Sequence, residues 1–110
     1  MRGSLVICLL LCTAGCGPDP LYLTRQDSGH SHSATAGQEI RIRLVAFATG
    51  YHVESISSSA VRFIKSEAIP PYLPSGPDLL FTFEAVHSGS AEIRIGDMRD
   101  DLFIYRIDVR

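Results

Sequence analysis

Hydrophobic and polar residues alternate along four stretches of this 110-residue chain. The clearest is Ile40–Leu44, where Ile and Leu alternate with Arg, and the same period of two returns in Phe81–Ala85, Ala91–Ile95 and Tyr105–Val109. Successive side chains of a β-strand point to opposite faces, so each stretch predicts a strand with one buried face. Four strands of this kind exclude an all-helical domain.

Four weaker stretches complete the predicted set of strands. They are Leu21–Arg25, His30–Thr35, Tyr51–Ile56 and Val61–Glu67, separated by clusters of Gly, Pro, Ser and Asp. No stretch has the 3.6-residue period of an amphipathic helix. Strands of this composition need two sheets packed face to face, because a single sheet would leave an apolar face in water. The predicted fold class is therefore all-β: one immunoglobulin-like β-sandwich domain of seven to eight antiparallel strands.

Two connections between these strands carry distinctive residues. His87–Ser90 predicts a hairpin connection, with Gly89 at positive φ. Ile69–Pro77 contains four prolines in nine residues. Proline has no N–H for a strand ladder and holds the chain extended, so this stretch predicts a long, stiff loop.

The first residues of the chain predict where it works. Arg2 supplies one positive charge, Leu5–Leu11 is a short apolar run, and small residues follow, which is the pattern of an export signal. The apolar run is too short to cross a bilayer as a helix, which needs about 20 residues. The segment is therefore predicted to be cleaved.

The sequence Thr-Ala-Gly-Cys at positions 13–16 resembles the bacterial lipobox, in which a peptidase cuts before a cysteine whose thiol carries diacylglycerol. The motif departs at Thr13, where Leu is usual, and the alternative is a conventional secretory signal with an incidental cysteine. The resemblance implies a signal peptide over 1–15, a lipidated Cys16, a tether over 16–20 and a folded domain over 21–110.

This interpretation places the chain in the cell envelope, lipid-anchored to a bacterial membrane. Gly17 follows the cysteine where Asp would retain some lipoproteins in the inner membrane. The outer membrane, on its periplasmic side or at the surface, is the expectation for a Gram-negative cell.

After such cleavage the chain offers little catalytic chemistry. Cys8 and Cys12 leave with the signal and Cys16 is blocked by lipid, so neither a disulfide nor a free thiol remains. The rest of the chain has no Gly-x-Ser-x-Gly motif and no convincing carboxylate pair. The chain is predicted not to be an enzyme and to need no cofactor.

The charges argue against two classes of partner. Ten Lys and Arg against twelve Asp and Glu give a net charge of −2, with both signs scattered along the chain. Nucleic acid and anionic lipid surfaces attract proteins through clustered positive charge, so neither is an expected partner.

Four histidines raise the alternative of a metal site. His30 and His32 lie two residues apart, a spacing that puts both on one face of a strand, and His52 and His87 would complete a set. The favoured interpretation is that His30 and His32 are polar residues facing solvent, because no Cys or acidic ligand stands nearby at metal spacing. No metal is predicted.

Three segments, taken in order, carry a resemblance to a known family. Ala48–Tyr51 follows the strand ending at Leu44, Pro74–Pro77 precedes a Phe-x-Phe strand, and Gly96–Asp101 joins the last two strands. In this order the chain resembles the chagasin-type inhibitors of papain-family cysteine peptidases. These immunoglobulin-like sandwiches carry an Asn-Pro-Thr-Thr-Gly-Tyr/Phe loop, a Gly-x-Gly-Gly loop and an Arg-Pro-Trp loop.

The resemblance covers the chain from Leu21 to its C-terminus and assigns six candidate peptidase-binding residues. Thr49 takes the place of the threonine that approaches the catalytic cysteine of the peptidase. Gly50 allows close approach of the backbone, and Tyr51 braces the loop against the sandwich. The flanking contacts are Ser75, Gly76 and Arg99.

The chain departs from the family in all three motifs. In the first, Ala and Phe replace Asn and Pro, and in the second, prolines replace both outer glycines. In the third, Arg99 lacks the following Pro-Trp, and Asp97, Asp100 and Asp101 place negative charge where the family has an apolar rim. Affinity at an interface is concentrated in a few buried aromatic and Arg anchors, so these departures weaken the expected inhibition.

The leading hypothesis is a lipid-anchored, monomeric inhibitor of papain-like cysteine peptidases that inserts its loops into the active-site cleft without covalent reaction. The alternative is a structural or adhesive immunoglobulin-like envelope module without inhibitory activity, since Ala85–Ile93 is also similar to the late strands of bacterial immunoglobulin-like repeats. A third class is an assembly or chaperone lipoprotein that binds a partner through a sheet edge.

Overall fold

The computed structural model describes residues 19–45, 50–73, 76–97 and 101–110, and within them the chain is almost entirely β-strand. In chain order the elements are β1 (Leu21–Thr24), the short 3₁₀ helix η1 (Arg25–Asp27), β2 (Ser31–Ala34), β3 (Glu39–Leu44), β4 (His52–Ile56), β5 (Val61–Leu73), β6 (Gly76–Ala85), β7 (Gly89–Gly96) and β8 (Leu102–Val109). All eight predicted strands are present. The described residues contain no helix long and apolar enough to cross a membrane.

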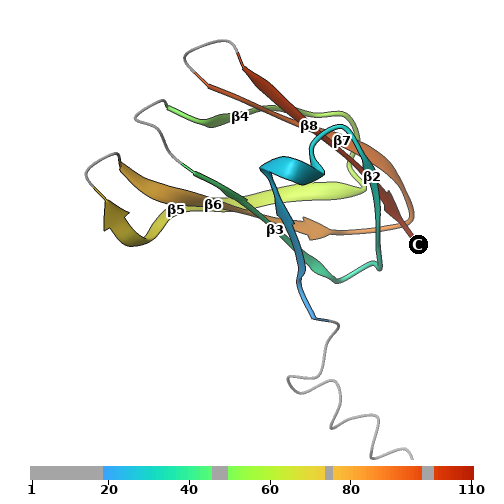
Figure 1. Ribbon diagram of the computed structural model, residues 1–110. Coiled ribbons are helices and arrows are strands. Elements are labelled where there is room, and N and C mark those ends of the chain that lie inside the picture. The colour runs from blue at the N-terminus through green and yellow to red at the C-terminus, as the bar shows by residue number, and fades with distance from the viewer. Residues whose placement is uncertain (1–18, 46–49, 74–75, 98–100) are drawn as a thin grey trace, which may run out of the picture.

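The strands form two four-stranded sheets that face each other (Figure 1). The first sheet has the order β1-β3-β6-β5 and the second has the order β2-β8-β7-β4. The predicted β-sandwich is confirmed. Two of its ladders are parallel, β1 with β3 and β2 with β8, while the other four are antiparallel. The chain reaches these two edges through η1, which carries it from the first sheet to the second.

The core lies between the sheets and is built from the predicted inward positions. From the first sheet, Ile40, Ile42 and Phe83 are fully buried, and from the second, Ile93 and Ile107 are fully buried. Burying a side chain of this size contributes about 1.5–3 kcal/mol relative to leaving it exposed. The alternation of these strands therefore has a direct energetic cause: a slip of one residue would turn every core side chain to solvent.

The side chain of Tyr105 joins the core to the first crossover of the chain. Its ring is fully buried, and its hydroxyl donates a hydrogen bond of 2.9 Å to the carbonyl oxygen of Thr24, at the end of β1. Burial raises the pKa of Tyr105 above its ordinary value. The phenol therefore stays neutral and keeps its proton for this bond.

The proline-rich stretch is a hairpin and not the long loop that the sequence predicted. β5 continues to Leu73 and β6 begins at Gly76. Prolines are tolerated here because β5 is the outer strand of its sheet, and because the register shifts between Ile69 and Tyr72. The two prolines between these residues stand in an irregularity of the ladder, where no N–H is required.

The predicted hairpin at His87–Ser90 is also corrected. β6 ends at Ala85 in the first sheet and β7 begins at Gly89 in the second, so the connection crosses between the sheets. The positive φ of Gly89 is confirmed, at 143°. Local turn residues predicted a reversal of the chain, but they do not specify which sheet receives the next strand.

We expect Tyr105→Phe to lower the free energy of unfolding by about 1–2 kcal/mol, because the Thr24 carbonyl loses its buried donor while the ring still fills the core. The matched control is Tyr22→Phe, since the Tyr22 side chain is 61% exposed and its loss of a hydroxyl should cost less than about 0.5 kcal/mol. Urea unfolding of both variants measures the difference. Equal effects would show that the Tyr105 bond contributes no net stability.

Candidate binding site at the loop end

Three connections of the chain, β3–β4, β5–β6 and β7–β8, begin and end at the same end of the sandwich, here called the loop end. In the first sheet, Leu44 at the end of β3 pairs with Leu79 near the start of β6. In the second sheet, Gly96 at the end of β7 pairs with His52 at the start of β4 and with Leu102 at the start of β8. These are the connections that hold the three predicted contact segments, so the fold brings their flanks together (Figure 1).

The structure describes three of the six predicted peptidase-binding residues. Gly50 is exposed and immediately precedes Tyr51, and Gly76 opens β6 opposite Leu73. Thr49, Ser75 and Arg99 lie outside the described residues, as does the predicted lipidation site Cys16.

Tyr51 closes the base of the β3–β4 connection. Its hydroxyl donates a 2.9 Å hydrogen bond to the carbonyl oxygen of Val45, the residue directly after β3. Its half-buried ring packs against Phe103 of β8, with ring centroids 5.9 Å apart and planes tilted by 58°. One side chain thus ties both ends of the connection to each other and to the second sheet.

The row of side chains continues beyond Tyr51 to η1. The guanidinium carbon of Arg25 lies over the Phe103 ring, 6.0 Å from its centroid, which is the geometry of a cation–π contact. Neither Arg25 nor Phe103 is among the residues predicted from the sequence. Phe103 continues the period of two that leads into Tyr105 and Ile107, so its inward direction was readable, but its partner on another connection was not.

A pocket lies beside this row, at the same end of the first sheet. Its volume is about 320 Å³, and its lining residues are Thr24, Arg25, Gln26, Arg43 and Val45. The Arg43 guanidinium is paired with Asp78 at 2.7 Å, whereas Val45 is 48% exposed. The surface of the loop end therefore combines the exposed apolar side chain of Val45 with two guanidinium groups. That of Arg43 is paired with a carboxylate, and that of Arg25 lies over an aromatic ring.

The β7–β8 connection is closed at its base by two aspartates. The backbone N–H of Asp101 donates to Asp97 Oδ1 at 3.0 Å, and the N–H of Asp97 donates to the Asp101 carbonyl oxygen at 3.2 Å. Asp97 is 8% exposed. Asp97 is therefore mostly buried, and its carboxylate accepts a hydrogen bond that helps to shape the turn. Asp101 is exposed as predicted, and Asp100 lies outside the described residues.

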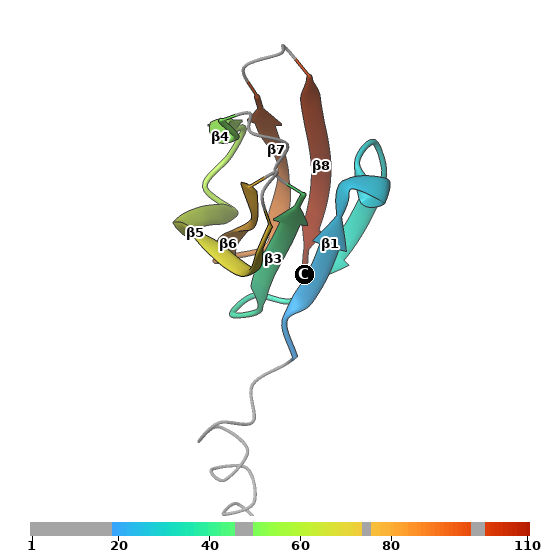
Figure 2. The same cartoon turned by 60° about the vertical axis from the view of Figure 1, so that its left-hand side comes forward.

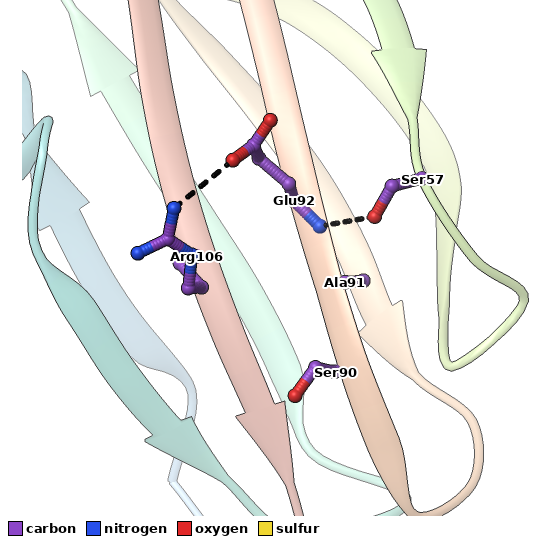
Figure 3. Close-up of a pocket in the computed structure, with 5 residues that line it drawn as sticks. All are labelled: Ser57, Ser90, Ala91, Glu92 and Arg106. Carbon is purple, nitrogen blue, oxygen red and sulfur yellow. Dashed lines mark hydrogen bonds and ion pairs between the residues drawn. The ribbon is translucent and has the colours of Figure 1, made fainter.

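A second pocket lies on the outer face of the second sheet, away from the loop end (Figure 3). It has a volume of about 270 Å³ and is lined by Ser57, Ser90, Ala91, Glu92 and Arg106. A hydrogen bond from Arg94, and to a smaller extent one from Arg106, holds the pKa of Glu92 below its usual range. The carboxylate of this pocket is therefore already paired with two guanidinium groups.

The histidines do not form the alternative metal site. Among the described residues, which include all four histidines, no three metal-ligating side chains gather. His32 Nε2 lies 3.0 Å from the Asp27 carbonyl oxygen, and His87 Nε2 lies 2.9 Å from Ser59 Oγ. The imidazoles serve local turns on different parts of the sandwich.

Comparison of the whole structure with solved structures identifies the fold. The cysteine protease inhibitor EhICP2 from Entamoeba histolytica superposes with a TM-score of 0.70 at 14% sequence identity, covering 86% of this chain and 100% of that one. The solution structure of amebosin superposes with a TM-score of 0.64 at 18% identity, with the same coverage. The chain has a chagasin-like fold.

The sequence itself matches no family model and no curated protein. The similarity to the two solved structures therefore concerns the path of the backbone. One of the two solved structures is a cysteine protease inhibitor by name.

We expect Phe103→Ala to lower the free energy of unfolding by about 2 kcal/mol, because the half-buried ring packs against Tyr51 and beneath Arg25. Leu102→Ala is the matched control, since Leu102 neighbours Phe103 in β8 but is 40% exposed. Urea unfolding compares the two. If Leu102→Ala costs as much as Phe103→Ala, the aromatic row does not hold the loop end together.

Proposed function

We propose that this chain is a lipid-anchored inhibitor of papain-like cysteine peptidases that inserts its loop end into the active-site cleft without covalent reaction. The observation that carries the proposal is the convergence of three connections at one end of a chagasin-like sandwich, with Tyr51 bracing the connection that contains Ala48–Tyr51. The similarity to EhICP2, a cysteine protease inhibitor by name, supports this direction.

In this proposal the contact is steric. Thr49 stands over the catalytic cysteine of the peptidase, Gly50 lets the backbone approach closely, and Tyr51 holds the connection in place. Ser75, Gly76 and Arg99 make flanking contacts from the other two connections. No step requires a nucleophile, a metal or a cofactor from this chain.

The Tyr51 brace gives such a mechanism its physical basis. Binding by a loose loop costs the free energy of ordering it, about 0.5–1.5 kcal/mol for each immobilised side chain. The hydrogen bond to Val45 and the contact with Phe103 restrict the connection before any partner arrives. A wedge restricted in this way loses less entropy on entering a cleft.

The anchor belongs to the same proposal. The Thr-Ala-Gly-Cys sequence supports lipidation of Cys16 after removal of residues 1–15, and hence a location in the cell envelope. Its target would then be a peptidase that shares this compartment.

The departures from the family motifs favour one alternative, a structural or adhesive immunoglobulin-like module. Prolines at both outer positions of the second motif, and the absent Pro-Trp of the third, remove contacts that the family uses. A module of this kind would keep the sandwich and be indifferent to changes in the β3–β4 connection.

Inhibition of papain and of one cathepsin L-type enzyme by residues 17–110 distinguishes these functions. We expect an inhibition constant in the micromolar range or tighter, about −8 kcal/mol of binding free energy. Thr49→Arg should weaken it by about 100-fold, because a long charged side chain meets the catalytic cysteine. The free energy of unfolding should change by less than about 0.5 kcal/mol.

Thr35→Arg is the matched control, because Thr35 is an exposed threonine in the β2–β3 connection at the opposite end of the sandwich. It should inhibit as the unchanged domain does. Absence of inhibition by the unchanged domain at about 100 µM, a binding free energy weaker than about −5.5 kcal/mol, would favour the structural module.

A further inference from the structure

The direction of β1 decides which end of the sandwich lies near the start of the chain. β1 pairs in parallel with β3, with Leu21 opposite Ile40 and Thr24 opposite Arg43. β3 runs toward the loop end, so β1 begins at the opposite end, here called the base. The chain enters the domain below the strands in Figure 2, and β8 also ends there, at Val109.

The entering segment is held against the base by a side chain. Gln38 Nε2 donates a 2.8 Å hydrogen bond to the carbonyl oxygen of Asp19, two residues before β1. The same amide group accepts, through Oε1, a 2.9 Å hydrogen bond from the backbone N–H of Thr35. Gln38 thus clips the entering chain to the β2–β3 connection, so the fold determines where this segment leaves the domain.

The clip leaves a very short tether. Cys16, the proposed lipidation site, precedes Asp19 by three residues. An extended chain spans at most about 3.5 Å per residue, so the lipid-bearing residue stays within about 10 Å of the clip. A domain on a tether of this length cannot turn its loop end to the membrane, because the strands hold that end about 25 Å from the base.

Most arginines described on the two broad faces of the sandwich are paired with carboxylates, so neither face strongly attracts an anionic membrane. On the first sheet, Arg41 pairs with Glu39, Arg43 with Asp78, and Arg62 with Glu84. On the second, Glu92 pairs with Arg94 and Arg106, the latter pair visible in Figure 3. Attraction to anionic lipid requires unneutralised positive charge, and these pairs set four carboxylates against five arginines, which leaves one net positive charge among them.

We propose that the mature protein stands on its membrane with the base next to the lipid and the loop end pointing away. This inference rests on the lipid anchor of the proposed function, and it specifies the partner. The peptidase presents its cleft to the loop end from the aqueous phase, about 25–35 Å above the lipid surface. A peptidase whose cleft lies level with the same bilayer does not fit.

Energy transfer from labelled cysteines to acceptor-labelled lipid headgroups tests the orientation in the full mature protein. The lipid blocks Cys16 and the signal removes the other cysteines, so one introduced thiol is labelled specifically. Ser88→Cys places the donor at the base, in the exposed β6–β7 connection, and Asp101→Cys places it at the loop end. The lipidated protein is reconstituted into phosphatidylcholine vesicles.

We expect transfer from position 88 to exceed transfer from position 101 by about twofold, because the strands separate the two labels by about 25 Å along the membrane normal. Equal efficiencies, or the reverse order, would overturn the orientation. A protein that fails to associate with vesicles would overturn the anchor and the orientation together, while leaving inhibition by the soluble domain untouched.

A longer tether tests whether the short clipped segment is what sets the orientation of the domain. Insertion of about ten Gly and Ser residues after Pro18 gives the domain freedom to turn, so the two efficiencies should converge. An unchanged difference would show that the short clipped tether does not set the orientation.

Inhibition by the vesicle-bound protein tests whether the peptidase approaches from the aqueous phase. Vesicle-bound protein should inhibit soluble papain within about threefold of the free domain, because the loop end remains accessible from the water. Inhibition by the free domain that is lost on the vesicle would overturn the inference and leave the proposed function standing.

Discussion

Burial of the inward faces of β3 and β6 against those of β7 and β8 is the interaction on which the rest of the molecule depends. Ile40, Phe83, Ile93 and Ile107 are fully removed from water. Burial of each of these side chains contributes about 1.5–3 kcal/mol, a large share of the roughly 5–15 kcal/mol by which a small domain is stable. The four strands therefore fix both the strand register and the spacing of the sheets. β1, β2, β4 and β5 are edge strands that attach to this centre.

The edges and ends of the sandwich are tied to that centre by a few polar and aromatic contacts. Tyr105 reaches from the core to the carbonyl of Thr24 and so secures the crossover through η1. Tyr51 and Phe103 connect the β3–β4 connection to β8, and Gln38 clips the entering chain to the base. The two ends of the sandwich therefore differ. One end carries the three connections of the candidate site, and the other carries the start of the domain.

Several features of the fold and the site were predictable because they are local. The inward positions of β3, β6, β7 and β8 follow from the alternation of apolar and polar residues along each strand. The proline-rich hairpin was not predictable in this way, because whether a proline is tolerated depends on the strand being an edge and on a ladder irregularity between Ile69 and Tyr72. The burial of Asp97 was missed because its hydrogen-bonding partner is the backbone of Asp101, across a turn.

The sequence by itself determined the strand count and the core faces, since these depend on side-chain period and residue type. Only the tertiary structure decided which strands pair, that β1 and β2 join their neighbours in parallel, and that Phe103 and Arg25 extend the row from Tyr51. The reason is physical: pairing and aromatic contacts join residues far apart in the chain, and their partners are selected by the packing of the two sheets as a whole.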